Sequence, residues 1–365
     1  MDPNQQNNNL SYSQYPAVRH RSRKKKAGAV GILIFVMLLI LLLFAAVIIY
    51  LISNPGIFQP SSQPVSETTQ ETTETTSETP ETVPETEPET ETQPERSDTD
   101  FTYTDLILTE KDMHSGTLIL VNSQYPYDFD IDVETQTFYG NKNNSYKISG
   151  IHIEMEVEAM RRFNMMMAAF QEETDHDDLL VYDASRSYKE QEQIYFEELE
   201  QVGEKYASQN VAMPGHTDHH TFYAVDLLVF TEEGRSFALG EGAAKEYDDW
   251  MKKNAHEYGF VIRYPESKRD RFKVICEDSH YRYVGLPHSY YMDSAHLCLE
   301  EYIDALRSFP KDGKHLHVAD NMGVSWEIYF VPATGDLTAV PVPAGYEYTV
   351  SGNNVDGFVI AVRLD

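Results

Sequence analysis

Apolar residues recur at helical spacing in four stretches between residues 153 and 308. We predict helices over Ile153–Gln171, Tyr188–Glu204, Ala243–Tyr258, and from Asp293 or Ser294 to Ser308. Ser187 is a suitable N-cap for the second helix, and Gly259 ends the third. The first helix carries a methionine run at residues 165–167, which we interpret as core packing rather than as a metal or cofactor site.

Runs of β-branched and aromatic residues bounded by turn residues indicate strands in the same part of the chain. Short strands are expected over residues 106–121, of which Leu118–Val121 is the strongest, and residues 122–150 have no regular pattern. Further strands are predicted over Leu179–Tyr182, Tyr223–Phe230, Phe260–Tyr264 and Tyr281–Val284. Because helices and strands mix without a repeated βαβ rhythm, we expect an α+β domain in which helices flank an antiparallel sheet.

The last part of the chain, residues 311–365, has a different pattern and predicts a small all-β appendage. Three alternating or β-branched runs are separated by turn residues, over Trp326–Val331, Tyr346–Val350 and Phe358–Val362. Its aromatic residues suit either binding of a glycan or protein, or packing against the preceding domain. We favour packing.

An uncharged apolar run at residues 27–52 follows a basic segment and predicts a transmembrane helix. The run exceeds the roughly 20 residues that span a bilayer. A signal peptide is the alternative, but Asn54, Pro55 and Phe58 follow where a small-residue cleavage site would be needed. The Lys/Arg residues between Arg19 and Lys26 place residues 1–26 in the cytoplasm as a basic tail. Everything after the helix is then outside the cell.

Residues 53–100 are rich in Thr, Glu, Pro and Ser and should form a disordered linker, because few apolar side chains are available to bury. The linker suits a tether that spans a cell wall, or a connection whose length is immaterial.

The chain carries a net charge of −30 at pH 7, which excludes a role in binding nucleic acid phosphates. The two cysteines, Cys276 and Cys298, are equally consistent with one disulfide bond or with two buried thiols.

The chemistry concentrates in the segment Met213–Asp226. A turn leads into several histidines, and an apolar strand follows that carries one carboxylate, Asp226. Imidazole nitrogen and carboxylate oxygen are both good zinc ligands, and a catalytic zinc usually takes three of them from the protein. We expect the third ligand from Glu277–His280. Of His216, His219 and His220, the residues alone do not decide which one binds the metal.

Four blocks in this chain resemble, in order, the signatures of the VanY-type zinc D-alanyl-D-alanine carboxypeptidases. Pro214–Asp226 resembles P-G-x-S-E-H-x-x-G-x-A-V-D, and Ser185–Gln191 resembles Y-R-S-Y-x-x-Q. Trp250–Pro265 is similar to the helix and strand that precede the last ligand. Glu277–Gly285 resembles E-P-W-H-x-R-Y-V-G. The similarity covers roughly residues 115–307 and implies a Hedgehog/DD-peptidase-like fold, which makes residues 101–310 a zinc peptidase domain.

The resemblance also implies roles for individual residues. Matched to the signature, the zinc (Zn2+) ligands would be His219, Asp226 and His280. Glu277 would be the general base, and Arg186 would face the scissile carbonyl. Substrate contacts are expected from Tyr188, Gln191 and Phe222.

The chain departs from the family pattern around these positions. Phe222 replaces a glycine, Phe272 and Lys273 replace Thr-Gly, and Asp278-Ser279 replaces Pro-Trp. A phenylalanine at position 222 would narrow the cleft or alter the bend of the strand. These changes affect the expected substrate and turnover more than metal binding.

Together these observations lead us to expect a membrane-anchored zinc D,D-carboxypeptidase that removes the terminal D-alanine from peptidoglycan stem peptides. A single anchor and a domain directed to the wall fit a bacterium without an outer membrane. Two alternatives stay open within the fold: an L,D-carboxypeptidase and a D-Ala-D-Ala dipeptidase. A third is a catalytically inactive wall-binding or sensory ectodomain.

Overall fold

A largely antiparallel sheet forms the centre of the fold, as the sequence predicts. The computed structural model describes residues 101–230, 236–239, 244–272 and 277–364. The sheet has the strand order β3–β5–β6–β9–β8, with β7 paired to β6, and only the β3–β5 pair is parallel. Its strands are β3 (Lys147–Ile148), β5 (Leu179–Asp183), β6 (Ala224–Phe230), β7 (Ser236–Ala238), β8 (Phe260–Tyr264) and β9 (Glu277–Tyr283).

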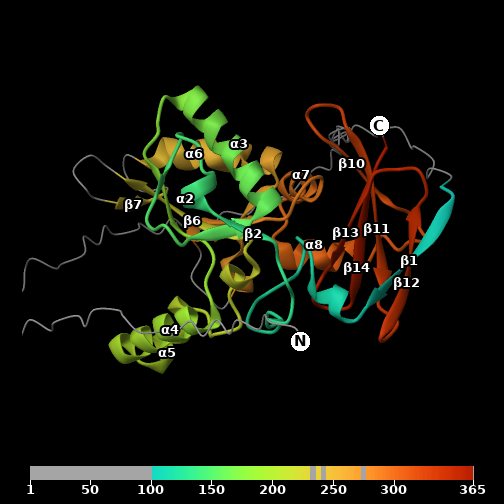
Figure 1. The fold of residues 1–365 in the computed structure, drawn as a ribbon, viewed down its shortest axis with the longest axis horizontal. Helices are drawn as coiled ribbons and strands as arrows, with labels where there is room; N and C mark the ends of the chain where they lie inside the picture. Colours follow the sequence, from blue (N-terminus) through green and yellow to red (C-terminus); the bar gives the residue numbers. More distant parts are fainter. Residues whose placement is uncertain (1–100, 231–235, 240–243, 273–276, 365) are drawn as a thin grey trace, which may run out of the picture. The chain divides into compact units, whose positions relative to one another are not determined.

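Two helices, α3 (Val157–Thr174) and α6 (Lys245–Asn254), cover one face of this sheet (Figure 1). The predicted apolar stripe of α3 is largely buried, and Met166 and Met167 lie in the same core, which confirms the packing role for these two. Met165, the first of the run, is 45% exposed and does not belong to the core. The start of the predicted helix instead forms a short strand, β4 (Glu154–Glu156). Two further short elements, β2 (Thr135–Thr137) and α2 (Phe138–Asn141), lie in the stretch where the sequence shows no regular pattern. β2 and β4 pair with each other.

A helical pair, α4 (Tyr188–Val202) and α5 (Glu204–Asn210), lies beyond the other face of the sheet (Figure 1). Ser187 caps α4 as predicted, in a reciprocal capping box with Glu190. Gly203, with a φ of 80°, ends α4 close to the predicted end of the helix, and the sequence analysis did not predict the short helix α5 that follows. α4 buries only one of its side chains, that of Gln191.

The predicted strand over Leu118–Val121 is wrong. These residues are buried but do not join a sheet: the N–H of Leu120 donates to the backbone carbonyl oxygen of Asn353, and side chains bind other backbone groups of the run. Arg282 donates to the carbonyl oxygen of Ile119 at 3.1 Å, and Asn354 donates to that of Leu120 at 2.8 Å. A buried apolar run therefore has its hydrogen bonds satisfied without β pairing.

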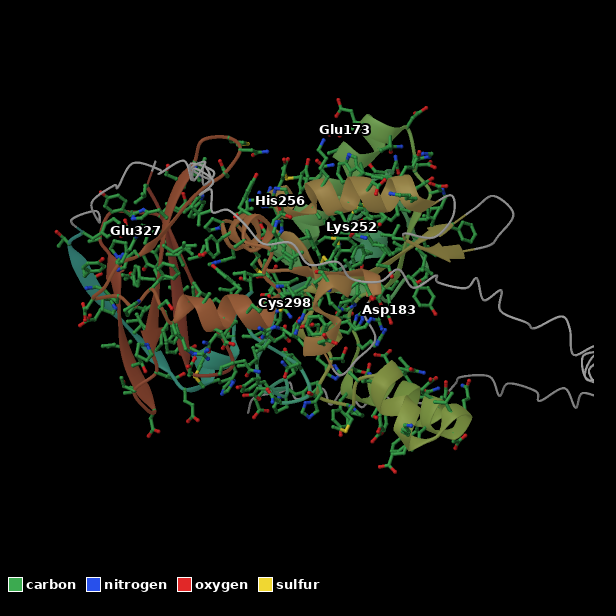
Figure 2. All side chains as sticks on the ribbon, turned by 180° about the vertical axis from the view of Figure 1, so that it is seen from behind. Glu173, Asp183, Lys252, His256, Cys298 and Glu327 are labelled. Carbon is green, nitrogen blue, oxygen red and sulfur yellow. The ribbon has the colours of Figure 1, made fainter. Side chains whose placement is uncertain are left out.

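The last predicted helix begins later than the sequence suggests. Asp293 and Ser294 do not cap it but end a separate helix, α7 (His288–Ser294). The helix α8 (Leu299–Leu306) has Cys298 as its N-cap, with Glu301 completing the capping box. Cys298 is buried (Figure 2), and burial raises the pKa of its thiol to about 11. Its companion Cys276 lies outside the described residues.

The C-terminal segment forms a second antiparallel sheet in the order β10–β11–β14–β13. Its strands are β10 (Leu316–Ala319), β11 (Ser325–Pro332), β13 (Tyr348–Gly352) and β14 (Gly357–Arg363). One face packs on α8 together with Leu118 and Leu120. The other face packs on a two-stranded ribbon of β1 (Tyr103–Thr109) and β12 (Leu337–Pro343). The first described strand is thus part of the C-terminal β structure, a pairing that the sequence analysis did not foresee.

Single-turn 3-10 helices complete the secondary structure: η2 (Lys111–His114), η3 (Asp218–Thr221), η5 (Ala255–Tyr258) and η6 (Glu266–Arg271). Within the described residues, no helix is both long and apolar enough to cross a bilayer. The predicted tail, transmembrane helix and linker, residues 1–26, 27–52 and 53–100, lie outside the described residues.

Candidate metal centre and catalytic cleft

Three elements bring the predicted ligands together. His219 lies in η3, directly before β6, and Asp226 lies on β6. His280 lies on the neighbouring strand β9, where it is the register partner of Asp226. Among the residues that the structure describes, this triad is the one group of three or more His, Cys, Asp and Glu whose ligand atoms approach closely enough to share a metal, all within 4.8 Å of one another.

The carboxylate of Asp226 lies between the two imidazoles. Its Oδ1 is 2.6 Å from Nδ1 of His280, and its Oδ2 is 3.2 Å from Nε2 of His219. Burial by itself raises the pKa of Asp226, but the two histidines beside it hold that pKa well below its usual value. The carboxylate is therefore ionised, as a metal ligand must be.

The donor set fits a divalent metal such as zinc. Two donor atoms that each lie about 2 Å from a tetrahedral zinc ion are about 3.3 Å apart, close to the observed spacing between His219 and Asp226. Nδ1 of His219 contacts the backbone carbonyl oxygen of Ala184, which can only accept a hydrogen bond. This contact puts the proton on Nδ1 and leaves Nε2 to coordinate, an arrangement common among metal-binding histidines.

The neighbouring histidines are engaged elsewhere. His220 donates from Nδ1 to the carbonyl oxygen of Arg186 at 2.7 Å, and its Nε2 accepts from the backbone N–H of Gly215 at 3.1 Å. Burial lowers the pKa of His220 to about 4, which keeps this ring neutral. Nδ1 of His216 contacts the carbonyl oxygen of Asn122 at 2.7 Å. Of the three candidates that the sequence left open, only His219 faces Asp226.

Arg186 points its guanidinium into the same site. It donates from Nη2 to Oδ2 of Asp226 at 3.4 Å, and its side chain is 17% exposed. Two further acceptors fix its direction: Asp183 accepts from Nε at 2.6 Å, and Gln191 accepts from Nη1 at 3.0 Å. Asp183 is the last residue of β5 and is labelled in Figure 2. The sequence analysis did not identify it as a partner of Arg186, although the spacing of three residues between them was an available signal.

A cleft of about 370 Å³ opens onto the triad and Arg186. Its other walls are mostly apolar, with polar groups near the triad, and consist of Tyr182, Gln191, Ile194, Asn210, Val211, Ala212, Thr217, Leu228, Tyr264 and Ser279. Of the three predicted substrate contacts, Gln191 lines the cleft, whereas Tyr188 and Phe222 do not. Gln191 also donates to the carbonyl oxygen of Ala212 at 2.7 Å, which joins α4 to the segment after α5.

Tyr188 and Phe222 have other surroundings. Tyr188 is 48% exposed and packs edge-on against Phe129, with ring centroids 5.6 Å apart. Phe222 ends η3 in the left-handed region, with φ of 63°, and its carbonyl oxygen accepts from the N–H of Glu156. A glycine would meet this backbone requirement without strain. The phenylalanine therefore occupies a left-handed position that favours glycine, in the turn before β6, and does not line the cleft.

The ring of His280 has an aromatic support that the sequence did not reveal. Tyr264, at the end of β8, stacks on His280 with ring centroids 5.4 Å apart and an interplanar angle of 26°. Phe272 in turn packs edge-on against Tyr264, with ring centroids 5.2 Å apart. Phe272, which stands where the family pattern has a small residue, thus acts on the site through Tyr264.

Glu277 is the first residue of β9, three positions before His280, and pairs in register with Tyr264. Regular alternation would place residues three apart on opposite faces of a strand. The β8–β9 register shifts between Ile262 and Tyr264, so that regular alternation does not hold along this stretch.

Comparison with known proteins relates this site to one family. The family model described as VanY, D-alanyl-D-alanine carboxypeptidase, matches residues 152–286, a range that contains the triad, Arg186 and Glu277. A D-alanyl-D-alanine carboxypeptidase of Enterococcus faecium is 31% identical over 273 residues, which covers 73% of this chain and 82% of that protein. The bifunctional D-Ala-D-Ala dipeptidase and carboxypeptidase VanXYC of Enterococcus gallinarum is 33% identical over 129 residues, 35% of this chain and 68% of that one.

A solved structure shows the same architecture over most of the described residues. It is the vancomycin resistance D,D-dipeptidase VanXYg in complex with a D-Ala-D-Ala phosphinate analog. The two superpose with a TM-score of 0.62 at 28% identity, covering 72% of this chain and all of that one. The chain is thus similar to both carboxypeptidases and dipeptidases.

Proposed function

Because this chain belongs to the VanY family of D-alanyl-D-alanine carboxypeptidases, we propose that it is a zinc-dependent D,D-carboxypeptidase that removes the terminal D-alanine from peptidoglycan stem peptides. The observation that carries the proposal is the convergence of His219, Asp226 and His280 beside Arg186 at the end of a cleft. The cleft combines apolar side chains with a few polar groups, as is usual for pockets that bind small ligands.

His219, Asp226 and His280 would hold the zinc ion. When bound, zinc polarises a carbonyl oxygen and lowers the pKa of water toward 7. Oδ2 of Asp226 also contacts the guanidinium of Arg186, so the same carboxylate would bind the zinc ion and hold Arg186 beside it.

Two side chains carry the remaining steps. Glu277 accepts a proton from the attacking water and then delivers it to the amine that leaves with the terminal D-alanine. Arg186, which is permanently charged, donates hydrogen bonds to the carbonyl oxygen as negative charge develops there. Asp183 and Gln191 hold its guanidinium in place, so little reorganisation is needed when that charge appears.

A D-Ala-D-Ala dipeptidase activity is the second candidate. It is favoured by the similarity along the whole length of VanXYg, a D,D-dipeptidase. The carboxypeptidase has the broader support in sequence, since the Enterococcus faecium carboxypeptidase matches 273 residues and the bifunctional enzyme matches 129.

The first prediction separates these activities. We expect the zinc-loaded protein to release D-alanine from a stem pentapeptide that ends in D-Ala-D-Ala, and to do so faster than it cleaves the tetrapeptide or the free dipeptide. Mass spectrometry of the products distinguishes the three reactions, and a chelator should stop the cleavage. One bound zinc ion without cleavage of any of the three substrates would instead identify a non-catalytic ectodomain.

We also propose that residues 27–52 anchor the protein in the cell membrane, with residues 1–26 cytoplasmic and the peptidase domain outside. The uncharged apolar run and the basic residues before it support this arrangement. We expect the full chain in the membrane fraction and a variant without residues 1–52 in the soluble fraction. External protease should release the peptidase domain from intact cells. Full-length protein that partitions into the soluble fraction would contradict the anchor.

A further inference from the structure

A fully buried carboxylate, Asp218, lies next to the ligand His219 and has no part in the proposed reaction. Its side chain is 0% exposed, and it contacts two arginines that are also 0% exposed. Oδ2 accepts from Nε of Arg263 at 2.6 Å, and Oδ1 accepts from Nη1 of Arg282. Burying charged groups is costly unless each is paired, and here each has an oppositely charged partner, since Arg263 also pairs with Glu300.

The contacts of Asp218 lead to both histidine ligands. Asp218 and His219 are consecutive residues of η3, so a fixed position for Asp218 fixes the turn that presents His219. Its Oδ2 also accepts from the hydroxyl of Tyr264 at 3.3 Å, and the ring of Tyr264 stacks on His280. Arg282 lies on β9, two residues after His280.

The same network continues away from the site. Arg263 donates to both carboxylate oxygens of Glu300, on α8, at 2.8 and 2.7 Å. Arg282 donates to the carbonyl oxygens of Thr117 and Ile119 at 3.0 and 3.1 Å. The two arginines, on β8 and β9 of the central sheet, therefore connect Asp218 to α8 and to the segment around Thr117.

We infer that Asp218 is a positioning residue for the metal centre: it sets the turn that carries His219 and, through Tyr264, the ring orientation of His280. This inference rests on the proposed metal site but assigns to the chain a residue outside the ligand set. Groups that orient metal ligands typically contribute about 10–100-fold to metal affinity. Loss of the Asp218 carboxylate should weaken metal binding even though all three ligands remain.

The test is the Kd for zinc of the purified Asp218→Asn variant, measured by competition with a chromophoric chelator. We expect the Kd to rise about 10–100-fold relative to the unaltered protein. The cobalt-substituted variant should also show altered visible absorption bands, because these bands report the ligand geometry directly. Stability alone would not change their shape.

Glu300→Gln is the matched control, because it removes the other carboxylate partner of the same guanidinium, that of Arg263. It should leave the Kd and the cobalt spectrum unchanged, even if the metal-free protein unfolds at a lower temperature. Equal weakening by both variants would overturn the inference, since the effect would then be one of general stability. An unaltered Kd in Asp218→Asn would overturn it too.

Tyr264→Phe provides an independent test if Asp218→Asn does not fold. It removes only the hydroxyl that contacts Asp218 and keeps the ring that stacks on His280. We expect a weaker zinc affinity and a changed cobalt spectrum, and an unchanged result in both would overturn the inference. If the unaltered protein binds no zinc at all, the proposed function fails instead, so the two failures are distinguishable.

Discussion

Replacing Glu277 with Gln is expected to lower kcat for release of D-alanine by about 10²–10⁴-fold, the usual contribution of a general acid–base group. The amide has the shape of the carboxylate but cannot take the proton of the attacking water. Zinc content should stay at one equivalent, because the three proposed ligands, His219, Asp226 and His280, are unchanged in this variant. Metal analysis and single-turnover rates on the same preparation measure both effects.

Asp278→Asn is the matched control for this result. It removes the adjacent carboxylate on the same strand, β9, and the same negative charge. We expect a small change in rate, through the electrostatic surroundings of Glu277. Losses of equal size in the two variants would mean that general charge along β9, rather than one base, controls the reaction.

Replacing His219 with Ala is expected to abolish zinc binding and cleavage together. Two protein ligands rarely hold a catalytic zinc ion, so the Kd should rise by more than about 100-fold, the upper end of the effect of outer positioning groups. Chelator competition measures the Kd, and peptide cleavage at saturating zinc measures the remaining activity.

The tandem histidine provides the control. His220→Ala should keep its zinc, because both ring nitrogens of His220 are already hydrogen-bonded to the backbone of Arg186 and Gly215. The variant loses a contact to the segment that carries Arg186, and therefore we expect the rate to fall while the metal stays. Loss of zinc in His220→Ala, with retention in His219→Ala, would show that the other histidine is the ligand.

The predictions from sequence that hold are those that depend on local physics. The apolar spacing of α3 predicts a buried helical face, and Ser187 predicts the start of α4. The β-branched run around Asp226 predicts a strand, and β6 is observed. The prediction fails where the partners of an apolar run are distant, as at Leu118–Val121, whose carbonyl groups accept from Arg282 and Asn354.

By itself, the sequence determined the types of donor group at this site and the family signatures that contain them, because both are written in short stretches of chain. The signature selected His219 as the ligand, but only the tertiary structure shows why it and not His220 faces Asp226, since that depends on backbone carbonyl groups contributed by other segments. It also decided what holds Arg186 and Asp218 in place. Arg282 reaches the carbonyl of Ile119 across 163 residues of chain, and no local pattern encodes such a contact.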